Sequence, residues 1–335
     1  MKKITLIPGD GIGPEVSGAV QKIINASGAS IEWDIVNAGA DIYEETGELV
    51  PDSVYKSIEA NKVALKGPIT TPVGSGFRSI NVMLRKKYDL YSNIRPVQTL
   101  PGLKTPFNDI DLVIFRENTE GLYIGIEFER DNGVMEAIKK ITPEGSERII
   151  RAAFEFAQRM NRKSVAVVHK ANILKMADGL FLDMGRKIAL EYPHIEMKEV
   201  IVDNMCMQLV MNPNQYDVIV TMNLYGDILS DLCAGLVGGL GLVPGANIGK
   251  DLAIFEAVHG SAPDIAGQGK ANPIALLRSG CMMLDYIGCE NESNMIRSAI
   301  DTVLADGNSL TPDMGGSAST QDLTDAIIGA LNKTN

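Results

Sequence analysis

The chain has 335 residues, of which 45% are hydrophobic, and this length and composition predict two domains that share a large α/β core. Acidic residues outnumber basic ones by 42 to 31, which gives a formal net charge of −11, and no run of Lys or Arg exceeds a few residues. This balance argues against nucleic acid as a partner.

The first predicted unit is a strand followed by a helix. Residues 4–7 read as a short buried strand, and 14–27 as an amphipathic helix with proline at its start. Between them, Gly9-Asp-Gly-Ile-Gly13 departs from the GxGxxG spacing of dinucleotide loops. A tight turn and a nucleotide-binding loop therefore both remain open for this segment.

Strands and helices continue to alternate along the chain, in the doubly wound α/β order. Strands are predicted at 31–36, 63–65, 111–115, 164–169, 196–202, 217–222 and 252–259. Helices are predicted at 51–61, 143–160, 171–191, 203–210 and 225–237, with three more beginning near residues 273, 293 and 320. Residues 124–128 alternate in polarity and predict an edge or arm strand. A glycine-rich reversal is expected at 235–249.

A loop rich in glycine and proline, residues 67–76, predicts an anion site. It is followed by a helical pattern for which Ser79 is the expected N-cap. Because a helix N-terminus presents unpaired N–H groups and a partial positive charge, Thr71, Ser79 and Asn81 are well placed to hold a carboxylate of a small acid.

Three arginines follow this loop. Arg85 lies one helical turn beyond Asn81, Arg95 lies in a short extended run, and Arg116 closes the strand at 111–115. Arginine grips planar carboxylates with two parallel hydrogen bonds, so three converging guanidinium groups predict a substrate with two or three carboxylates. The alternative is that these arginines are ordinary surface charges or ion-pair partners.

Two further patterns predict catalytic chemistry. Asp227 and Asp231 lie four residues apart at the start of a helix, so their carboxylates share one face and repel each other. A divalent cation such as Mg²⁺ or Mn²⁺ would explain the pair, although stabilisation of the helix dipole is the alternative. Lys170 ends an apolar strand, where the active sites of α/β proteins lie, unless its side chain only extends to solvent.

These segments together resemble the isocitrate and 3-isopropylmalate dehydrogenases, the metal-dependent β-decarboxylating dehydrogenases of 2-hydroxy acids. The likeness runs along almost the whole chain and includes Ile-Pro-Gly-Asp-Gly-Ile-Gly-Pro-Glu at 7–15. It implies an α/β fold like that of isopropylmalate dehydrogenase, with two domains on a shared twisted sheet, and not a Rossmann fold. The large domain would comprise 1–96 and 240–335, and the small domain 97–239, with a dimer clasp arm at about 123–142.

The resemblance also implies roles for single residues. Asp227 and Asp231 would bind the metal together with Asp203 from the neighbouring subunit of a homodimer. Lys170, also from the neighbour, would help to remove the substrate's hydroxyl proton. Tyr123 would supply a proton to the product enol. The active site would then be shared between subunits.

The small-residue-rich segment 256–273 matches the family's adenosine loop. By resemblance, His259, Gly260 and Ala262 would surround the adenosine and Asn272 would bond the adenine. Asp264 would accept a hydrogen bond from the ribose 2′-hydroxyl and repel a 2′-phosphate, as the acid of Rossmann proteins does, with the apolar Ile265 beside it. NAD is therefore the expected coenzyme.

The expected activity is NAD-dependent oxidative decarboxylation of isocitrate to 2-oxoglutarate and CO₂, with Mg²⁺ or Mn²⁺. Ser79 and Asn81 favour isocitrate because two hydrogen-bonding side chains suit a third carboxylate. Homoisocitrate and 3-isopropylmalate dehydrogenases are the enzyme alternatives. A regulatory subunit of a heteromeric isocitrate dehydrogenase is the non-enzyme alternative, which the presence of the full set of catalytic and metal residues argues against.

The cysteines and the N-terminus bear on location. Cys206, Cys233, Cys281 and Cys289 show no CxxC spacing and lie within apolar patterns, which predicts reduced thiols. The apolar stretch before Pro8 is too short for a secretory signal, and no segment reaches membrane-spanning length. A cytoplasmic protein with no membrane partner is expected.

Overall fold

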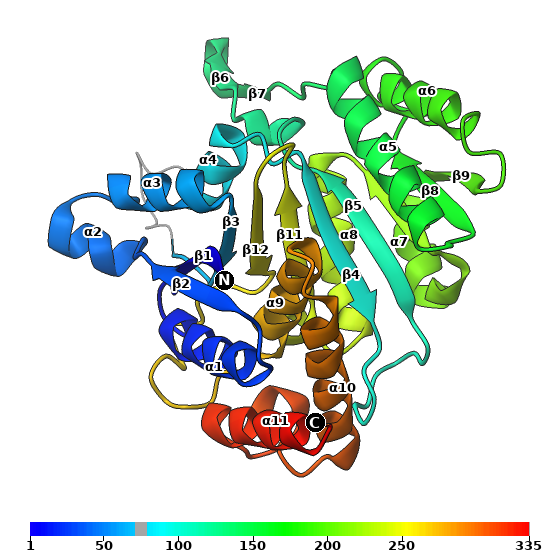
Figure 1. The fold of residues 1–335 in the computed structure, drawn as a ribbon. Coiled ribbons are helices and arrows are strands. Elements are labelled where there is room, and N and C mark those ends of the chain that lie inside the picture. The colour runs from blue at the N-terminus through cyan, green and yellow to red at the C-terminus, as the bar shows by residue number, and fades with distance from the viewer. Residues whose placement is uncertain (71–78, 335) are drawn as a thin grey trace.

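A computed structural model describes residues 1–70 and 79–334, whose backbone is built around one ten-stranded sheet (Figure 1). The strand order is β2-β1-β3-β12-β11-β4-β5-β10-β8-β9. These strands are β1 Lys2–Ile7, β2 Ile31–Ile35, β3 Val63–Lys66, β4 Ser92–Gln98, β5 Asp111–Glu117, β8 Ser164–His169, β9 Glu196–Ile201, β10 Val218–Thr221, β11 Pro244–Ile248 and β12 Ala253–Ala257.

The sheet is parallel at both ends and antiparallel in its centre. β11 runs antiparallel to both β12 and β4, and β4 runs antiparallel to β5, whereas the flanking neighbours pair in parallel. A Rossmann sheet is parallel through its centre. The predicted α/β fold other than a Rossmann fold is therefore confirmed.

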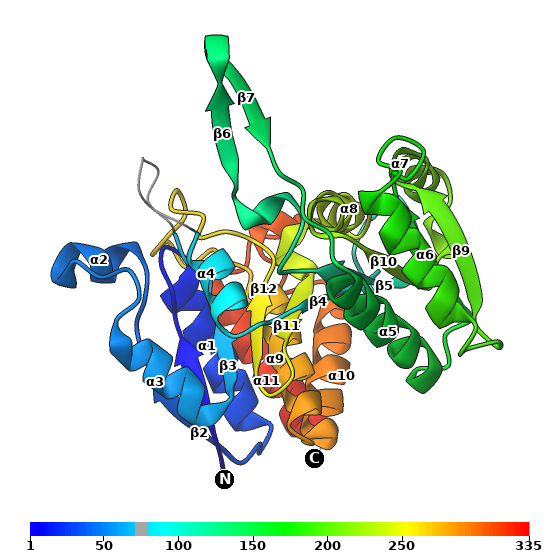
Figure 2. The same cartoon turned by 90° about the horizontal axis from the view of Figure 1, so that it is seen from above.

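Helices cover both faces of the sheet (Figures 1 and 2). They are α1 Gly13–Ala26, α2 Ala40–Thr46, α3 Asp52–Asn61, α4 Ile80–Lys87, α5 Pro143–Arg159, α6 Ala177–Ala189, α7 Val202–Met211, α8 Asn223–Leu236, α9 Ile274–Tyr286, α10 Glu290–Asp306 and α11 Thr320–Thr334. Among the described residues, no helix combines the length and the apolar character needed to cross a bilayer.

The alternation of side chains along β5 shows how the sheet separates two cores. Leu112 and Ile114 pack in a cluster with residues of α7 and α8, while Val113 and Phe115 pack with residues of α5 and α6. Successive side chains of a strand point to opposite faces, so a strand buried on both sides is apolar throughout. Two further clusters cover the two faces of β1, β3 and β12. The predicted domain boundaries stay a prediction.

Two segments differ from their predictions. β11 lies within the stretch expected to be a glycine-rich reversal. The helix predicted from residue 171 begins at Ala177, because the carbonyl of Lys170 first accepts hydrogen bonds from the amides of Ile173 and Leu174 in a turn.

A two-stranded hairpin projects from the body (Figure 2). It pairs β6 Glu127–Arg130 with β7 Val134–Ala137, within the predicted arm at 123–142. Its apolar side chains are exposed, and Met135 has 70% of its surface accessible. A hairpin with solvated apolar side chains lacks a core of its own.

The turn at residues 9–13 packs against the backbone of Pro68 and Ser261. Gly9 has φ +82°, and a Cβ there would lie 2.0 Å from the carbonyl oxygen of Pro68. The carboxylate of Asp10 accepts hydrogen bonds from the amides of Ala40 and Thr70. The glycines are thus explained by close backbone approach, which favours the tight turn over the nucleotide loop.

Candidate active site

A cavity of about 130 Å³ opens where α4, β4 and the end of β12 meet. Its polar walls are Lys66, Asn81, Arg85, Asn93, Arg95, Glu256 and His259. Three buried polar atoms of these side chains have no hydrogen-bond partner among the described residues, namely Asn81 Oδ1, Arg85 Nε and His259 Nε2. Buried polar atoms are normally paired, so this wall fits a polar ligand.

The start of α4 agrees with its prediction. Ser79 is the N-cap, and its hydroxyl accepts a hydrogen bond from the amide of Val82 at 3.5 Å. Asn81, in the first turn of α4, lines the cavity. Thr71, the other residue predicted to hold a carboxylate, lies outside the described residues.

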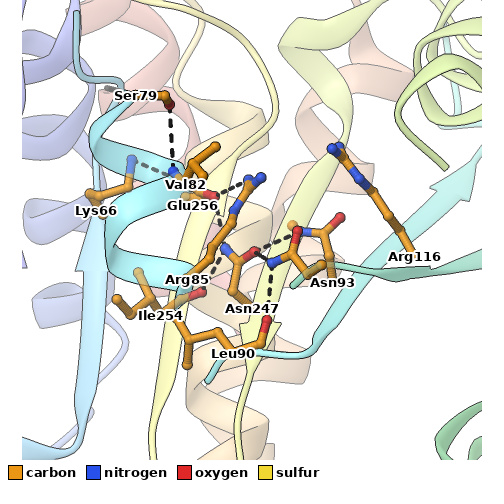
Figure 3. A network of polar contacts seen from close by, with 12 residues as sticks. Lys66, Ser79, Val82, Arg85, Leu90, Asn93, Arg116, Asn247, Ile254 and Glu256 are labelled. Atoms are coloured by element: carbon orange, nitrogen blue, oxygen red, sulfur yellow. Dashed lines mark hydrogen bonds and ion pairs between the residues drawn. The ribbon is translucent and has the colours of Figure 1, made fainter. Parts of the chain in front are cut away.

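Arg85 enters the cavity from the last turn of α4 and forms an ion pair with Glu256. Its Nη2 lies 3.0 Å from Glu256 Oε1, while Lys66 Nζ lies 2.6 Å from Oε2 (Figure 3). Burial by itself would raise the pKa of Glu256, but the charges of Lys66 and Arg85 outweigh burial and hold that pKa far below its usual range. Glu256 therefore stays ionised between two cations.

Arg95 and Arg116 reach the site from β4 and β5, whose residues Asn93 and Arg116 stand opposite each other. Burial, followed by repulsion from Arg116 and Arg85, lowers the pKa of Arg95 to about 10. Burial and the charge of Arg85 also lower the pKa of Arg116. Arg85 and Arg95 line the same cavity, and Arg95 and Arg116 both pair with Asp227 Oδ1, so the three predicted arginines lie close together. Such a group of positive charges favours an anion.

Asp227 and Asp231 lie in the first half of α8, beside these arginines. Asp227 accepts hydrogen bonds from Arg116 Nη1 and from the hydroxyl of Tyr123, whereas Asp231 lies 3.7 Å from Arg95 Nη1. Burial would raise the pKa of Asp227, but Arg116 and Tyr123 lower it, while burial raises that of Asp231. Their side chains remain 41% and 60% exposed, so both offer oxygen atoms to a cation.

Lys170 and Asp203 form a separate pair. Lys170 Nζ lies 2.5 Å from Asp203 Oδ1, and neither residue lines the cavity. Within the described part of one chain, no three His, Cys, Asp or Glu side chains are grouped to hold a metal ion. The predicted metal site of Asp203, Asp227 and Asp231 therefore stays a prediction.

The predicted adenosine loop borders the same cavity through His259 and Gly260. Burial lowers the pKa of His259, whose Nδ1 lies 2.9 Å from the carbonyl oxygen of Gly260. Ala262 has φ +38°, which marks a strained bend of this loop. Asp264 is exposed on the loop, while Ile265 packs partly against the core.

Asn272, which is predicted to bond the adenine, forms hydrogen bonds within the chain. Its Oδ1 accepts a hydrogen bond from the amide of Ile274 at the start of α9, and its Nδ2 donates to Asp313 Oδ2 at 2.9 Å. Both ends of the amide thus have partners within the chain. Bonding to an adenine would have to share or exchange one of them, and the assignment stays a prediction.

The sequence analysis did not single out Lys66, Glu256 or Asn93 as site residues. Lys66 ends β3 and is only 2% exposed. A lysine at the end of an apolar strand is the same signal that indicated Lys170. The signal was missed for Lys66 because its strand was predicted to end at residue 65. Glu256 and Asn93 lie in strands, where no local pattern distinguishes a ligand-facing side chain.

A cavity walled by buried cations, next to two carboxylates, defines a site for a small polyanion. Residues 3–327 match the family model described as isocitrate/isopropylmalate dehydrogenase. The chain belongs to this family of oxidoreductases, and the predicted resemblance is confirmed.

Individual relatives agree with the family. A Drosophila melanogaster protein, named as the probable mitochondrial alpha subunit of isocitrate dehydrogenase (NAD), is 50% identical over 331 residues, which are 98% of this chain and 88% of the relative. A Dictyostelium discoideum protein, named as a mitochondrial regulatory subunit of isocitrate dehydrogenase (NAD), is 50% identical over 335 residues, which are 100% of this chain and 93% of the relative. The crystal structure of isocitrate dehydrogenase from Methylococcus capsulatus is 52% identical, has a TM-score of 0.95 and covers 99% of both chains.

The predicted cytoplasmic location is wrong by this comparison. Relatives from Drosophila melanogaster, Arabidopsis thaliana and Macaca fascicularis, 49% to 50% identical to this chain, are named as mitochondrial subunits. The prediction relied on reduced cysteines, and all four are indeed free thiols. Free thiols indicate a reducing compartment but do not distinguish one such compartment from another.

Proposed function

We propose that this chain is a catalytic isocitrate dehydrogenase that oxidises isocitrate with NAD and releases CO₂ and 2-oxoglutarate. The observation that carries the proposal is a cavity that the buried Arg85 and Arg95 line, with unpaired polar atoms in its wall and with the buried Arg116 next to Arg95 on Asp227. Guanidinium groups bind carboxylates by paired hydrogen bonds, and several of them suit a substrate with several carboxylates. Asn81 adds a side-chain amide to the same wall.

A divalent cation completes the proposed site. Asp227 and Asp231 supply the oxygen ligands that Mg²⁺ and Mn²⁺ prefer, and both are partly open to solvent. A cation held by these two residues would supply Lewis-acid chemistry to the bound substrate. Arg116 lowers the pKa of Asp227 and so favours its ionised form, which is the state that a metal ligand requires, and Arg95 Nη1 lies 3.7 Å from Asp231.

Tyr123 and Lys170 are the proposed proton-transfer residues. Burial, then the hydrogen bond to Asp227, raises the pKa of Tyr123, so its phenol carries a proton that it can donate to the product enol. Lys170 would help to remove the substrate's hydroxyl proton. The backbone amide of Lys170 donates to the buried Asp178 at 2.7 Å, which fixes the point from which its side chain extends.

We further propose a homodimer in which Lys170 and Asp203 serve the partner's site. The support is an exposed apolar surface near these two residues and on the arm. Its members include Met207, Val210 and Met211 on α7, Ile228 on α8, and Phe128 and Met135 on the hairpin. Exposed apolar side chains that gather on the same elements are typical of protein interfaces.

NAD is the proposed coenzyme because of Asp264. Its carboxylate is exposed on the loop beside the cavity, and no hydrogen bond to another described residue occupies it. A unit charge pair at about 4 Å is worth roughly 4 kcal/mol at an effective dielectric of 20, and a site open to water realises only part of this. Even half would make NADP more than tenfold poorer than NAD, given about 1.4 kcal/mol per factor of ten.

The test is a substrate and coenzyme panel on the purified single chain. Isocitrate, homoisocitrate and 3-isopropylmalate are each offered with NAD and with NADP in the presence of Mn²⁺. Efficient turnover of isocitrate with NAD is the expected result. One relative is named a regulatory subunit, so the absence of turnover by the chain alone, with activity restored by an added catalytic subunit, would favour the regulatory alternative.

A further inference from the structure

A line of buried side chains connects Arg95 to Glu256 beneath the cavity. Arg95 Nε donates to Asn93 Oδ1 at 2.7 Å, and Asn93 Nδ2 donates to Asn247 Oδ1 at 2.8 Å. Asn247 Nδ2 then donates to Glu256 Oε1 at 2.7 Å, the oxygen that also receives Arg85 Nη2 (Figure 3). Two of the proposed substrate-binding arginines are therefore linked without interruption through two asparagines and Glu256.

The register of the sheet places these asparagines in one row. β11 lies between β12 and β4, and Asn247 stands opposite both Ile254 and Asn93. Asn93 in turn stands opposite Arg116 on β5. Residues in direct register project to the same face of a sheet, so backbone pairing itself brings the two amides together on the side that faces the cavity.

The orientation of each amide is determined by its neighbours. The ionised Glu256 can only accept, so the Nδ2 of Asn247 must face it. The Oδ1 of Asn247 is then left for Asn93, which must turn its own Nδ2 inward and its Oδ1 towards Arg95. Turning over either amide would set acceptor against acceptor, so the line has only one satisfied arrangement.

We propose that Asn247 and Asn93 are positioning residues that hold Arg85 and Arg95 at a fixed separation and thereby set the affinity for a small polycarboxylate. This inference rests on the function proposed above. An arginine side chain has many rotamers, and fixing two guanidinium groups before the ligand arrives lowers the entropy lost on binding. Both asparagines are 1% exposed. Asn93 borders the cavity, but its Oδ1 and Nδ2 are engaged by Arg95 and Asn247, so its amide acts through the arginines.

Asn118 provides a matched control. Its Nδ2 donates to the same Oδ1 of Asn247 at 2.9 Å, and it is similarly buried, with 4% exposure. Its other side-chain hydrogen bond goes to the carbonyl oxygen of Leu90 and reaches no guanidinium group. Asn118→Ala therefore removes two buried side-chain hydrogen bonds, as Asn93→Ala does, while leaving the line between Arg95 and Glu256 intact.

The experiment compares Asn93→Ala with Asn118→Ala. Asn247→Ala would remove the partners of several buried groups at once and can unfold the chain, so it is a secondary variant. For each protein we would measure KM for the polycarboxylate, KM for NAD, kcat and the melting temperature. Asn93→Ala should raise KM for the polycarboxylate about tenfold or more, the loss expected from a misplaced charged hydrogen bond, while KM for NAD stays unchanged and kcat falls much less.

Asn118→Ala should lower the melting temperature to a similar degree with little change in either KM. An unchanged KM for the polycarboxylate in Asn93→Ala, or an equal rise in both variants, would overturn the proposal. The polycarboxylate used is the one that the unaltered chain turns over best. If the best substrate is not isocitrate, the proposed function is corrected, while the same two variants still decide the role of Asn93. A chain that binds none of the three acids would overturn both the proposed function and the positioning role.

Discussion

Glu256 offers the most direct measurement of the charge arrangement under the cavity. In Glu256→Gln, two buried cations lose their shared counter-charge. At an effective dielectric of 20, an ion pair at the 2.6 Å separation from Lys66 corresponds to about 6 kcal/mol of attraction. Desolvation offsets much of this, and breaking a buried pair by removing one partner typically costs about 3–5 kcal/mol.

This cost converts into a melting temperature. The entropy of unfolding is about 2.1 cal/mol/K per residue, or about 0.7 kcal/mol/K for a chain of this length. Glu256→Gln should therefore melt about 4–7 °C below the unaltered chain at pH 7. Glu32, whose exposed carboxylate lies 3.7 Å from Lys3, provides the control, and Glu32→Gln should change the melting temperature little.

The pH dependence gives a second and sharper criterion. The pKa of Glu256 in the folded chain lies far below 4.5, its ordinary value. A carboxyl group with a depressed folded pKa contributes stability that is fully present above the unfolded pKa and is lost as pH falls towards the folded pKa. The difference in melting temperature should thus be constant from pH 7 to about 5 and shrink below about 4.5.

Differential scanning calorimetry of the three proteins between pH 7 and pH 3.5 measures both effects. A melting temperature of Glu256→Gln within a degree of the unaltered chain would show that the pair is energetically neutral. A gap that stays constant down to pH 3.5 would show that Glu256 does not carry the titrating charge. Either result refutes the picture of an ionised carboxylate held between Lys66 and Arg85.

The remaining predictions concern catalysis. Asp227→Asn should greatly raise the Mn²⁺ concentration needed for half-maximal rate, and an unaltered requirement would remove Asp227 from the metal site. Ser79→Leu combined with Asn81→Leu should lower isocitrate kcat/KM about a hundredfold or more, at about 1.5–3 kcal/mol per lost charged hydrogen bond; near-normal turnover would mean that another group holds the third carboxylate. Lys170→Met and Tyr123→Phe, each inactive alone, should regain activity when mixed and refolded, because a mixed dimer contains one intact site. Verified heterodimers without activity would indicate that each chain builds its own site.

Local patterns predicted those parts of the site that depend on one element. Ser79 caps α4 because a hydroxyl before a helical pattern satisfies an N–H group whatever surrounds it. Asp227 and Asp231 share a face of α8 because helical geometry determines the four-residue spacing. Such features need only the neighbouring residues, so a single sequence is sufficient to find them.

β11 shows why other parts could not be predicted. Its residues, Pro244 to Ile248, include proline and glycine, which have low strand propensity, and the segment resembles a loop. Its strand conformation depends on antiparallel pairing with β12 on one side and β4 on the other. A Cβ at Gly245 would lie 2.9 Å from the carbonyl oxygen of Glu256, so a close approach also requires this glycine. Because this strand was not predicted, the sequence could not indicate that Asn247 faces the site.

The charges around the cavity bear on the choice between a dicarboxylate and a tricarboxylate. Four cations, Lys66, Arg85, Arg95 and Arg116, face the carboxylates of Glu256, Asp227 and Asp231, which leaves one positive charge. A divalent cation on the aspartates would raise this to three, and a substrate with three ionised carboxylates would balance it. A dicarboxylate with an alkyl group would leave one buried positive charge uncompensated and Asn81 Oδ1 facing hydrocarbon. We therefore expect 3-isopropylmalate to be the poorest substrate of the panel, while the choice between isocitrate and homoisocitrate depends on how far the third carboxylate reaches towards Ser79 and Asn81.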